Sequence, residues 1–306
     1  MSATLTLDLL QRFRERRAAG ASVKSLADEL GIPWQRLDKV LRHGMPGGPV
    51  FTVQPPPLPP PETLRPIEPE RAVLTPATKG PGLLVEKYRP KRLGAIFGQP
   101  DVVRALKAFV RAPYPAAFLF TGETGTGKTS AALALAVELG CDLNGKEFGG
   151  VHTLASGEQS ADAVRECCQR MWLRPMTGSG WKVFILNEAE RMHPQTETIW
   201  LDRLEDLPPK TVAIFTTNHG AKLNQRFRDR CIHLPFDSDA RRLEQSARVF
   251  LTRLWQAETG RPPAGKLIER LVSEATVYGR LSFRRAAQLL QPHLPPHRES
   301  SRRRSP

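Results

Sequence analysis

The stretch Thr121-Gly122-Glu123-Thr124-Gly125-Thr126-Gly127-Lys128-Thr129 has the spacing G-x-x-x-x-G-K-[ST]. An apolar run at 116–120 precedes it, and a second apolar run at 130–139 follows it. A buried strand that leads into a glycine-rich loop and then into a helix is the setting in which this motif binds phosphate. The stretch therefore predicts a protein that binds a nucleoside triphosphate.

Each residue type in this loop has a physical role. Its glycines let the backbone turn so that N–H groups point inward and form an anion-binding nest at the start of the next helix. Lys128 is expected to reach the β- and γ-phosphates, and the hydroxyl of Thr129 is expected to hold Mg²⁺. The expected nucleotide contacts in the loop are Gly122, Thr124, Gly125, Thr126, Gly127, Lys128, Thr129 and Ser130.

The composition indicates a protein with a polyanionic partner. The chain has 306 residues, of which 40% are hydrophobic, so it is long enough for two or three compact units. Its formal charge of +14 and its pI near 10.2 point to nucleic acid as the first candidate partner. The alternative is simple solubility combined with a basic tail, since Arg298 and the arginines at 302–304 lie at the C-terminal end.

No segment indicates secretion, a membrane or a metal cluster. Residues 1–10 lack a basic region followed by a long apolar core, and no apolar run approaches membrane-spanning length. The four cysteines form no C-x-x-C pair and have no histidines at zinc spacing, so they are expected to be reduced thiols. We therefore expect a cytoplasmic protein.

Proline divides the chain into units. Twelve of the 28 prolines fall between residues 46 and 81, where they remove backbone donors and favour an extended linker. Strand-like and helix-like runs alternate after the linker, which favours a parallel sheet covered by helices on both faces. The strands are expected at 116–120, 151–154, 182–186, 211–216 and 231–235, and after Asp237 only helices are expected, at 238–257, 264–277 and 282–291.

The segment before the linker is expected to form three short helices. Its run from 22 to 42 resembles a helix-turn-helix, with Ala27, Gly31 and Leu37 at that family's small, glycine and apolar positions. In such a module the second helix enters the major groove of DNA, and here it offers Gln35, Arg36, Lys39 and Arg42. The alternative is a small protein-docking domain with a solvated basic face.

Two polar residues end the strand expected at 182–186. Asn187 stands where an aspartate usually supports Mg²⁺ through water, and Glu188 stands where a glutamate orients the attacking water. Asparagine still accepts a hydrogen bond but lacks the negative charge, and loss of such an outer-shell partner typically costs about 10- to 100-fold in metal affinity or activity. Binding of nucleotide is expected to survive, with slow turnover.

An ordered series of motifs surrounds these residues. Tyr88-Arg89-Pro90 and Gly98-Gln99 precede the loop, Leu-Glu-Asp-Leu-Pro-Pro follows at 204–209, and Thr216-Thr217-Asn218 and Arg226-Phe227-Arg228-Asp229-Arg230-Cys231 come later. Over about residues 83–291 this series resembles the AAA+ ATPases of the clamp-loader group. The resemblance implies an α/β P-loop NTPase with a parallel sheet covered by helices, followed by a small helical lid and preceded here by a small all-α helix-turn-helix domain.

The resemblance also implies roles for particular residues. Asn218 takes the sensor role near the γ-phosphate, and Arg230 matches the arginine that reaches into the ATP site of a neighbouring subunit, although Asp229 replaces the usual serine before it. Arg284 matches the arginine of the second sensor, although Leu281 and Ser282 replace the usual Gly-Asp. Adenine is expected against Tyr88, Pro90, Phe97 and Gly98, with plain core packing as the alternative for the two aromatic residues.

These observations predict an ATP-hydrolysing, Mg²⁺-dependent machine that acts on DNA, assembles with other AAA+ subunits and works with a partner such as a sliding clamp or a helicase. The expected units are a helix-turn-helix domain (1–45), a linker (46–82), the nucleotide-binding domain (83–236), the lid (237–293) and a basic tail (294–306). We expect no C-terminal collar domain, which favours specialised replication, recombination or mobile-element maintenance. The alternatives are a DNA-bound switch that hardly hydrolyses ATP and a protein-remodelling ATPase.

Overall fold

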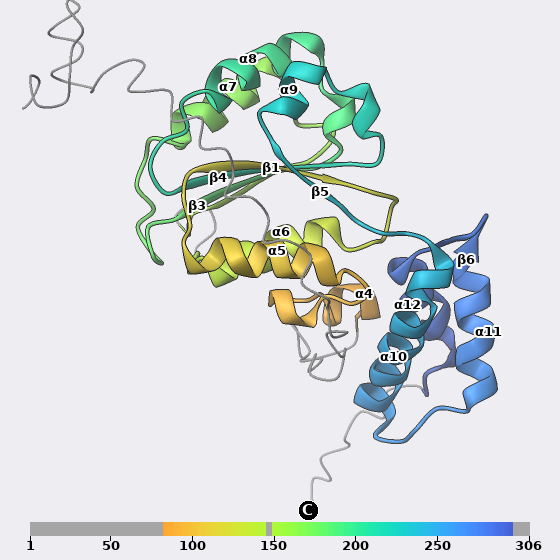
Figure 1. Ribbon diagram of the computed structural model, residues 1–306. Helices are drawn as coiled ribbons and strands as arrows, with labels where there is room; N and C mark the ends of the chain where they lie inside the picture. The colour runs from red at the N-terminus through yellow and green to blue at the C-terminus, as the bar shows by residue number, and fades with distance from the viewer. Residues whose placement is uncertain (1–81, 145–148, 296–306) are drawn as a thin grey trace, which may run out of the picture. The chain divides into compact units, whose positions relative to one another are not determined.

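The computed structural model describes residues 82–144 and 149–295 (Figure 1). The predicted helix-turn-helix, with Gln35, Arg36, Lys39 and Arg42, lies outside the described residues and stays a prediction. Within the described part, no helix is both long enough and apolar enough to cross a membrane.

A five-stranded parallel sheet forms the centre of the nucleotide-binding part (Figure 1). Its spatial order is β2-β3-β4-β1-β5. The strand β1, which leads into the glycine-rich loop, therefore lies between β4 and β5. The strands are β1 (Ala116–Thr121), β2 (Val151–Leu154), β3 (Lys182–Leu186), β4 (Thr211–Thr217) and β5 (Ile232–Pro235). All five strands agree with the prediction to within one residue.

The central strands are apolar at nearly every position because both faces of the sheet are covered. In β1, Phe118 and Phe120 face one core, whereas Ala117 and Leu119 face the other. The same alternation divides the buried residues of β3 and β4. Successive side chains of a strand point to opposite faces, so the two cores need an unbroken apolar run rather than an alternating one.

Helices cover both faces of this sheet, as Figure 1 shows. On one face lie α5 (Pro100–Arg111) and α6 (Lys128–Glu138), and on the other lie α7 (Ala161–Arg170), α8 (Pro194–Leu204) and α9 (Gln225–Asp229). The short 3₁₀ turns of this part are η2 (Leu93–Ala95), η4 (Ala189–Arg191) and η5 (Gly220–Lys222). The predicted α/β fold is confirmed.

A second core belongs to the helical lid. The lid contains α10 (Ala240–Thr259), α11 (Gly265–Ala275), α12 (Phe283–Leu290) and the 3₁₀ turn η6 (Gln291–His293). The helix α4 (Leu84–Lys87) packs into this same core through Leu84, and Tyr88 and Phe97 join it. The segment just before the sheet is therefore attached to the lid, although it lies far from the lid in sequence.

The prediction that strands stop after Asp237 is wrong. The helix expected to reach residue 277 ends at Ala275, and β6 (Thr276–Val277) pairs with β7 (Arg280–Leu281) as an antiparallel hairpin. Thr276 and Val277 are β-branched, which favours a strand, and the two turn residues Tyr278 and Gly279 adopt left-handed φ angles of 50° and 74°. The apolar spacing of the helix continues into the hairpin and hides this change.

The aromatic cluster under β4 generates a prediction about stability. Phe215 is fully buried and meets Trp200 and Phe227 edge to face, with ring centroids 5.0 and 4.8 Å away. We expect Phe215→Ala to lower the free energy of unfolding by about 3–5 kcal/mol, as large aromatic truncations in cores do. In the control Tyr278→Ala, which removes a fully exposed ring, the change should stay within about 0.5 kcal/mol. Urea unfolding measures both variants. Equal losses in the free energy of unfolding for Phe215→Ala and Tyr278→Ala would contradict this packing.

Candidate nucleotide site

The strand order brings the three predicted polar motifs to one edge of the sheet. Strand β4 pairs with β1 on one side and with β3 on the other, all in parallel. The carboxyl ends of parallel strands meet at the same edge, so Asn218 after β4 lies between the glycine-rich loop after β1 and the Asn187-Glu188 pair after β3. Ligands of open α/β sheets bind outside this edge.

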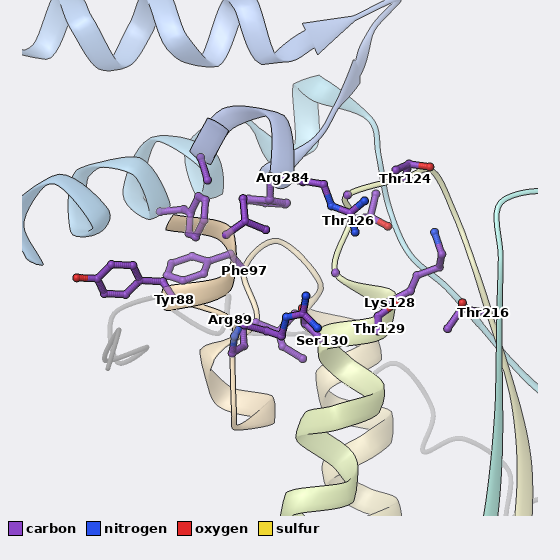
Figure 2. Close-up of a pocket in the computed structure, with 18 of the residues that line it drawn as sticks. Tyr88, Arg89, Phe97, Thr124, Thr126, Lys128, Thr129, Ser130, Thr216 and Arg284 are labelled. Carbon is purple, nitrogen blue, oxygen red and sulfur yellow. The ribbon is translucent and has the colours of Figure 1, made fainter. Parts of the chain in front are cut away.

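A cavity of about 360 Å³ lies at this edge, between the loop and the lid (Figure 2). The glycine-rich loop forms one side of it, and residues of α4, α10 and α12 form another. Of the predicted nucleotide contacts, the residues that line it are Thr124, Gly125, Thr126, Gly127, Lys128, Thr129, Ser130, Tyr88, Pro90 and Phe97, whereas Gly122 and Gly98 do not.

Two positions in the loop require glycine. Gly127 has a φ of 102° immediately before α6, a conformation that a residue with a Cβ rarely adopts. Gly125 has a φ of 82°, and a Cβ there would lie 2.1 Å from the hydroxyl of Ser282. The backbone carbonyl of Gly125 also accepts a hydrogen bond from the N–H of Phe283 at 3.1 Å. The loop and the start of α12 therefore touch through backbone.

Lys128 ties the loop to the sheet. Its ammonium donates hydrogen bonds to the carbonyls of Gly122 and Glu123 at 2.6 and 2.9 Å, and to Oδ1 of Asn218 at 2.9 Å. Burial lowers the pKa of Lys128 to about 8, and the nearby guanidinium of Arg284 acts in the same direction, whereas the carboxylates of Glu190 and Glu188 oppose it. The ammonium is thus poorly solvated, and protein oxygens accept its hydrogen bonds.

Thr129, Asn187 and Thr216 form a polar group beside the loop. The hydroxyls of Thr129 and Thr216 both donate to Oδ1 of Asn187, at 3.0 and 3.2 Å. Asparagine thus keeps the acceptor that an aspartate would offer and lacks its charge. These oxygens suit Mg²⁺, which in nucleotide sites takes few protein ligands and fills its shell with phosphate oxygens and water. Residues 82–144 and 149–295 contain no cluster of three His, Cys, Asp or Glu side chains placed to hold a metal.

Glu188 lies where the chain turns away from β3. Its φ of 55° is left-handed, which is unusual for a residue with a side chain. The side chain lines the cavity and forms an ion pair with Arg191 at 3.0 Å. An exposed pair of this kind is weak, so Arg191 does not prevent the carboxylate from contacting a ligand.

The end of the cavity away from the loop is lined mainly by apolar and aromatic side chains. Tyr88 and Phe97 line it and also belong to the buried core of the lid, so core packing is confirmed for both and contact with adenine stays a prediction. A Cβ on Gly98 would lie 2.7 Å from Leu243 and 2.9 Å from the ring of Phe283, so this glycine lets the segment pack closely on the lid.

The two predicted arginines lie in different places. Arg284, in the first turn of α12, lines the cavity together with the loop (Figure 2). Arg230 follows α9, is paired with Glu205 and donates to the carbonyl of Arg226 at 3.2 Å. It does not line the cavity of its own chain.

Several residues that line the cavity, or that contact its lining residues or the loop, were not predicted from the sequence. Arg89, Ile96 and Phe250 line the cavity, Arg280 forms an ion pair with Glu123 of the loop, and Glu190 accepts a hydrogen bond from the backbone N–H of Asn218 at 3.1 Å. The motif Tyr88-Arg89-Pro90 could have pointed to Arg89. No local spacing signals the other contacts, because each joins segments that are distant in the chain.

Comparisons with known proteins show sequence likenesses over part of this chain. A family model described as DNA polymerase III, delta subunit, matches residues 143–240. The replication factor C small subunit of Picrophilus torridus is 32% identical over 169 residues, which is 53% of this chain and 52% of that protein. The corresponding protein of Methanoculleus marisnigri is 31% identical over 177 residues, which is 58% of this chain and 53% of that protein. The chain thus spans about half the length of the curated relatives it matches.

Solved structures give weaker likenesses. A DNA polymerase III gamma subunit-related protein of Thermotoga maritima superposes with a TM-score of 0.47 at 17% identity, covering 62% of this chain and 58% of that one. The fold assignment therefore rests on the strand order, the glycine-rich loop and the sequence relatives. By these features the described part of this chain has an α/β P-loop fold that is similar to that of clamp-loader AAA+ proteins.

Proposed function

We propose that this protein binds ATP with Mg²⁺ in the cavity between the loop and the lid and hydrolyses it. The observation that carries the proposal is the poorly solvated ammonium of Lys128, held beside Asn218 at the mouth of a backbone nest. A triphosphate would supply the missing negative charge. Phosphoryl transfer needs mainly positioning and charge stabilisation, which these groups can provide.

Each residue has a proposed part in the reaction. Lys128 binds the β- and γ-phosphates, and Thr129 holds Mg²⁺ with Asn187 behind it. Glu188 orients the attacking water, and Asn218 contacts the γ-phosphate. Arg284 contacts the nucleotide from the lid of the same chain, while Arg230 would complete the site of an adjacent subunit. An arginine at the γ-phosphate contributes about 10³- to 10⁵-fold in rate, so turnover would depend on assembly.

The proposed target of the machine is DNA. The relatives are named for replication, the chain carries a formal charge of +14, and the predicted helix-turn-helix offers Gln35, Arg36, Lys39 and Arg42. Assembly with other AAA+ subunits, and a sliding clamp or helicase as the further partner, belong to the same proposal. Cytoplasmic, DNA-associated localisation follows from it.

Two departures from the expected motifs favour a second candidate function. Asn187 removes a negative charge from the metal side of the cavity, and Asp229 precedes Arg230 in place of serine. A protein with these two changes could bind ATP tightly and act as a DNA-bound switch with little turnover. Lys128, Glu188 and Asn218 are all present and favour hydrolysis instead.

A steady-state ATPase assay with and without duplex DNA separates these functions. We expect DNA to stimulate turnover, and we expect Lys128→Ala to abolish ATP binding and Glu188→Gln to abolish turnover while ATP still binds. The exposed control Glu166→Gln should behave as the wild type. Tight binding of ATP with negligible turnover would support the switch, and turnover that is indifferent to DNA would support protein remodelling.

Restoring the missing charge tests the assignment of Asn187. In Asn187→Asp the carboxylate can accept the same two hydroxyl hydrogen bonds and adds a negative charge near Mg²⁺. We expect the Mg²⁺ concentration needed for half-maximal turnover to fall, or the maximal rate to rise, by about 10- to 100-fold. Asn187→Ala, which removes the acceptor oxygen, is the control: it should raise the Mg²⁺ concentration needed for half-maximal turnover and lower the maximal rate. A Mg²⁺ titration that Asn187→Asp leaves unchanged would contradict the assignment.

The lowered pKa of Lys128 predicts uptake of a proton. Below the pKa of about 8 the ammonium is already charged, so ATP binding at pH 7 should take up almost no proton at this group. At pH 9 the amine is mostly neutral in the free protein, and the phosphates restore its charge, so binding should take up about one proton and become weaker. Calorimetry in buffers of different ionisation enthalpy measures this. Lys128→Arg, which stays charged, is the control. Equal uptake at both pH values would be inconsistent with the shift.

A further inference from the structure

Glu190 joins two parts of the cavity that are 28 residues apart in the chain. The left-handed turn at Glu188 directs that side chain into the cavity, whereas Glu190, two residues on, reaches back to the end of β4. There its Oε1 accepts the backbone N–H of Asn218 at 3.1 Å. The contact fixes the residue that follows β4 at its backbone rather than at its side chain.

The contact continues into the phosphate side of the cavity. With its backbone held by Glu190, Asn218 presents Oδ1 to the ammonium of Lys128 at 2.9 Å. Glu190, Asn218 and Lys128 therefore form one hydrogen-bonded series that connects the turn after β3, the end of β4 and the glycine-rich loop. Rotation of Asn218 would break the middle of this series.

The surroundings of Glu190 favour its charged form. Burial acts to raise its pKa, but hydrogen bonds from backbone N–H groups, including that of Asn218, and from Thr217 outweigh burial, so the pKa of Glu190 lies below its usual range. Glu190 is also the carboxylate that most strongly favours the charged form of Lys128. A permanent acceptor for the Asn218 N–H is thus available at neutral pH.

We propose that Glu190 is a positioning residue for ATP hydrolysis, which holds Asn218 in the orientation that meets the γ-phosphate. This rests on the hydrolysis proposed above. Glu190 itself is not among the residues that line the cavity. A misplacement of about 1 Å at a reacting group can cost about 100-fold in rate, so loss of a positioning contact should appear in kcat more than in binding of the common diphosphate part.

Three substitutions separate the hydrogen bond from the charge and from folding. Glu190→Ala removes both, Glu190→Gln keeps an acceptor oxygen without the charge, and Glu190→Asp keeps the charge but is one methylene shorter. We expect Glu190→Ala and Glu190→Asp to lower kcat by about 10- to 100-fold with unchanged ADP affinity, and Glu190→Gln to stay within about threefold of wild type. The control Glu158→Ala removes a carboxylate that accepts the N–H of Ala155 at 3.2 Å outside the cavity, and it should leave kcat unchanged.

A double-mutant cycle with Asn218→Ala tests whether the two residues act together. If Glu190 acts through Asn218, Glu190→Ala should lower kcat little further in a protein that already carries Asn218→Ala. Additive losses, a Glu190→Ala enzyme with wild-type kcat, or a Glu190→Gln enzyme as slow as Glu190→Ala would each overturn the proposal. Thermal melting of all variants shows whether they fold, and Glu190→Gln against Glu190→Asp decides the question if Glu190→Ala does not.

The wild-type protein provides the separate test of hydrolysis itself. If it binds ATP without turning it over, the proposed hydrolysis fails, and the same variants are compared by their preference for a non-hydrolysable ATP analogue over ADP. Glu190→Ala should then reduce this preference about fivefold or more, and Glu190→Gln should keep it. An unchanged preference in Glu190→Ala would overturn the positioning role independently of turnover.

Discussion

The hydrogen bonds of the Lys128 ammonium are the interaction on which the rest of the structure depends. They join two carbonyls of the glycine-rich loop to the side chain that follows β4. This is possible only because β4 lies beside β1, which in turn requires the crossover order of the sheet. Burial of the ammonium lowers the pKa of Lys128, because a charge is unfavourable in a poorly solvated site.

The lid closes the same site through backbone contacts. The N–H of Phe283 meets the carbonyl of Gly125, and the loop is so close to Ser282 that any side chain at 125 would collide. The lid core also includes Tyr88 and Phe97, the residues at the base end of the cavity. A nucleotide in this cavity would therefore touch the sheet part through its phosphates and the lid part through its base.

Much of the fold and the phosphate side of the site could be predicted from the sequence because their signals are local. The apolar runs of β1, β3 and β4, the glycines of the loop and the polar residues at strand ends each lie within a few neighbouring positions. The β6–β7 hairpin was missed because Thr276 and Val277 continue the apolar spacing of α11. Glu190 was missed because its partner lies after another strand, and only the sheet brings the two together.

The substitution at Asn187 shows what geometry adds to a motif. From sequence alone it is a departure that weakens the metal side of the site. In the structure its Oδ1 still accepts hydrogen bonds from Thr129 and Thr216, so the shape of the site is kept while one charge is lost.

Direct binding of ATP tests the central claim most simply. Calorimetric titration of the full chain with ATP in the presence of Mg²⁺ should show one site per chain, lost in Lys128→Ala; the absence of any binding to the folded wild-type protein would contradict this account.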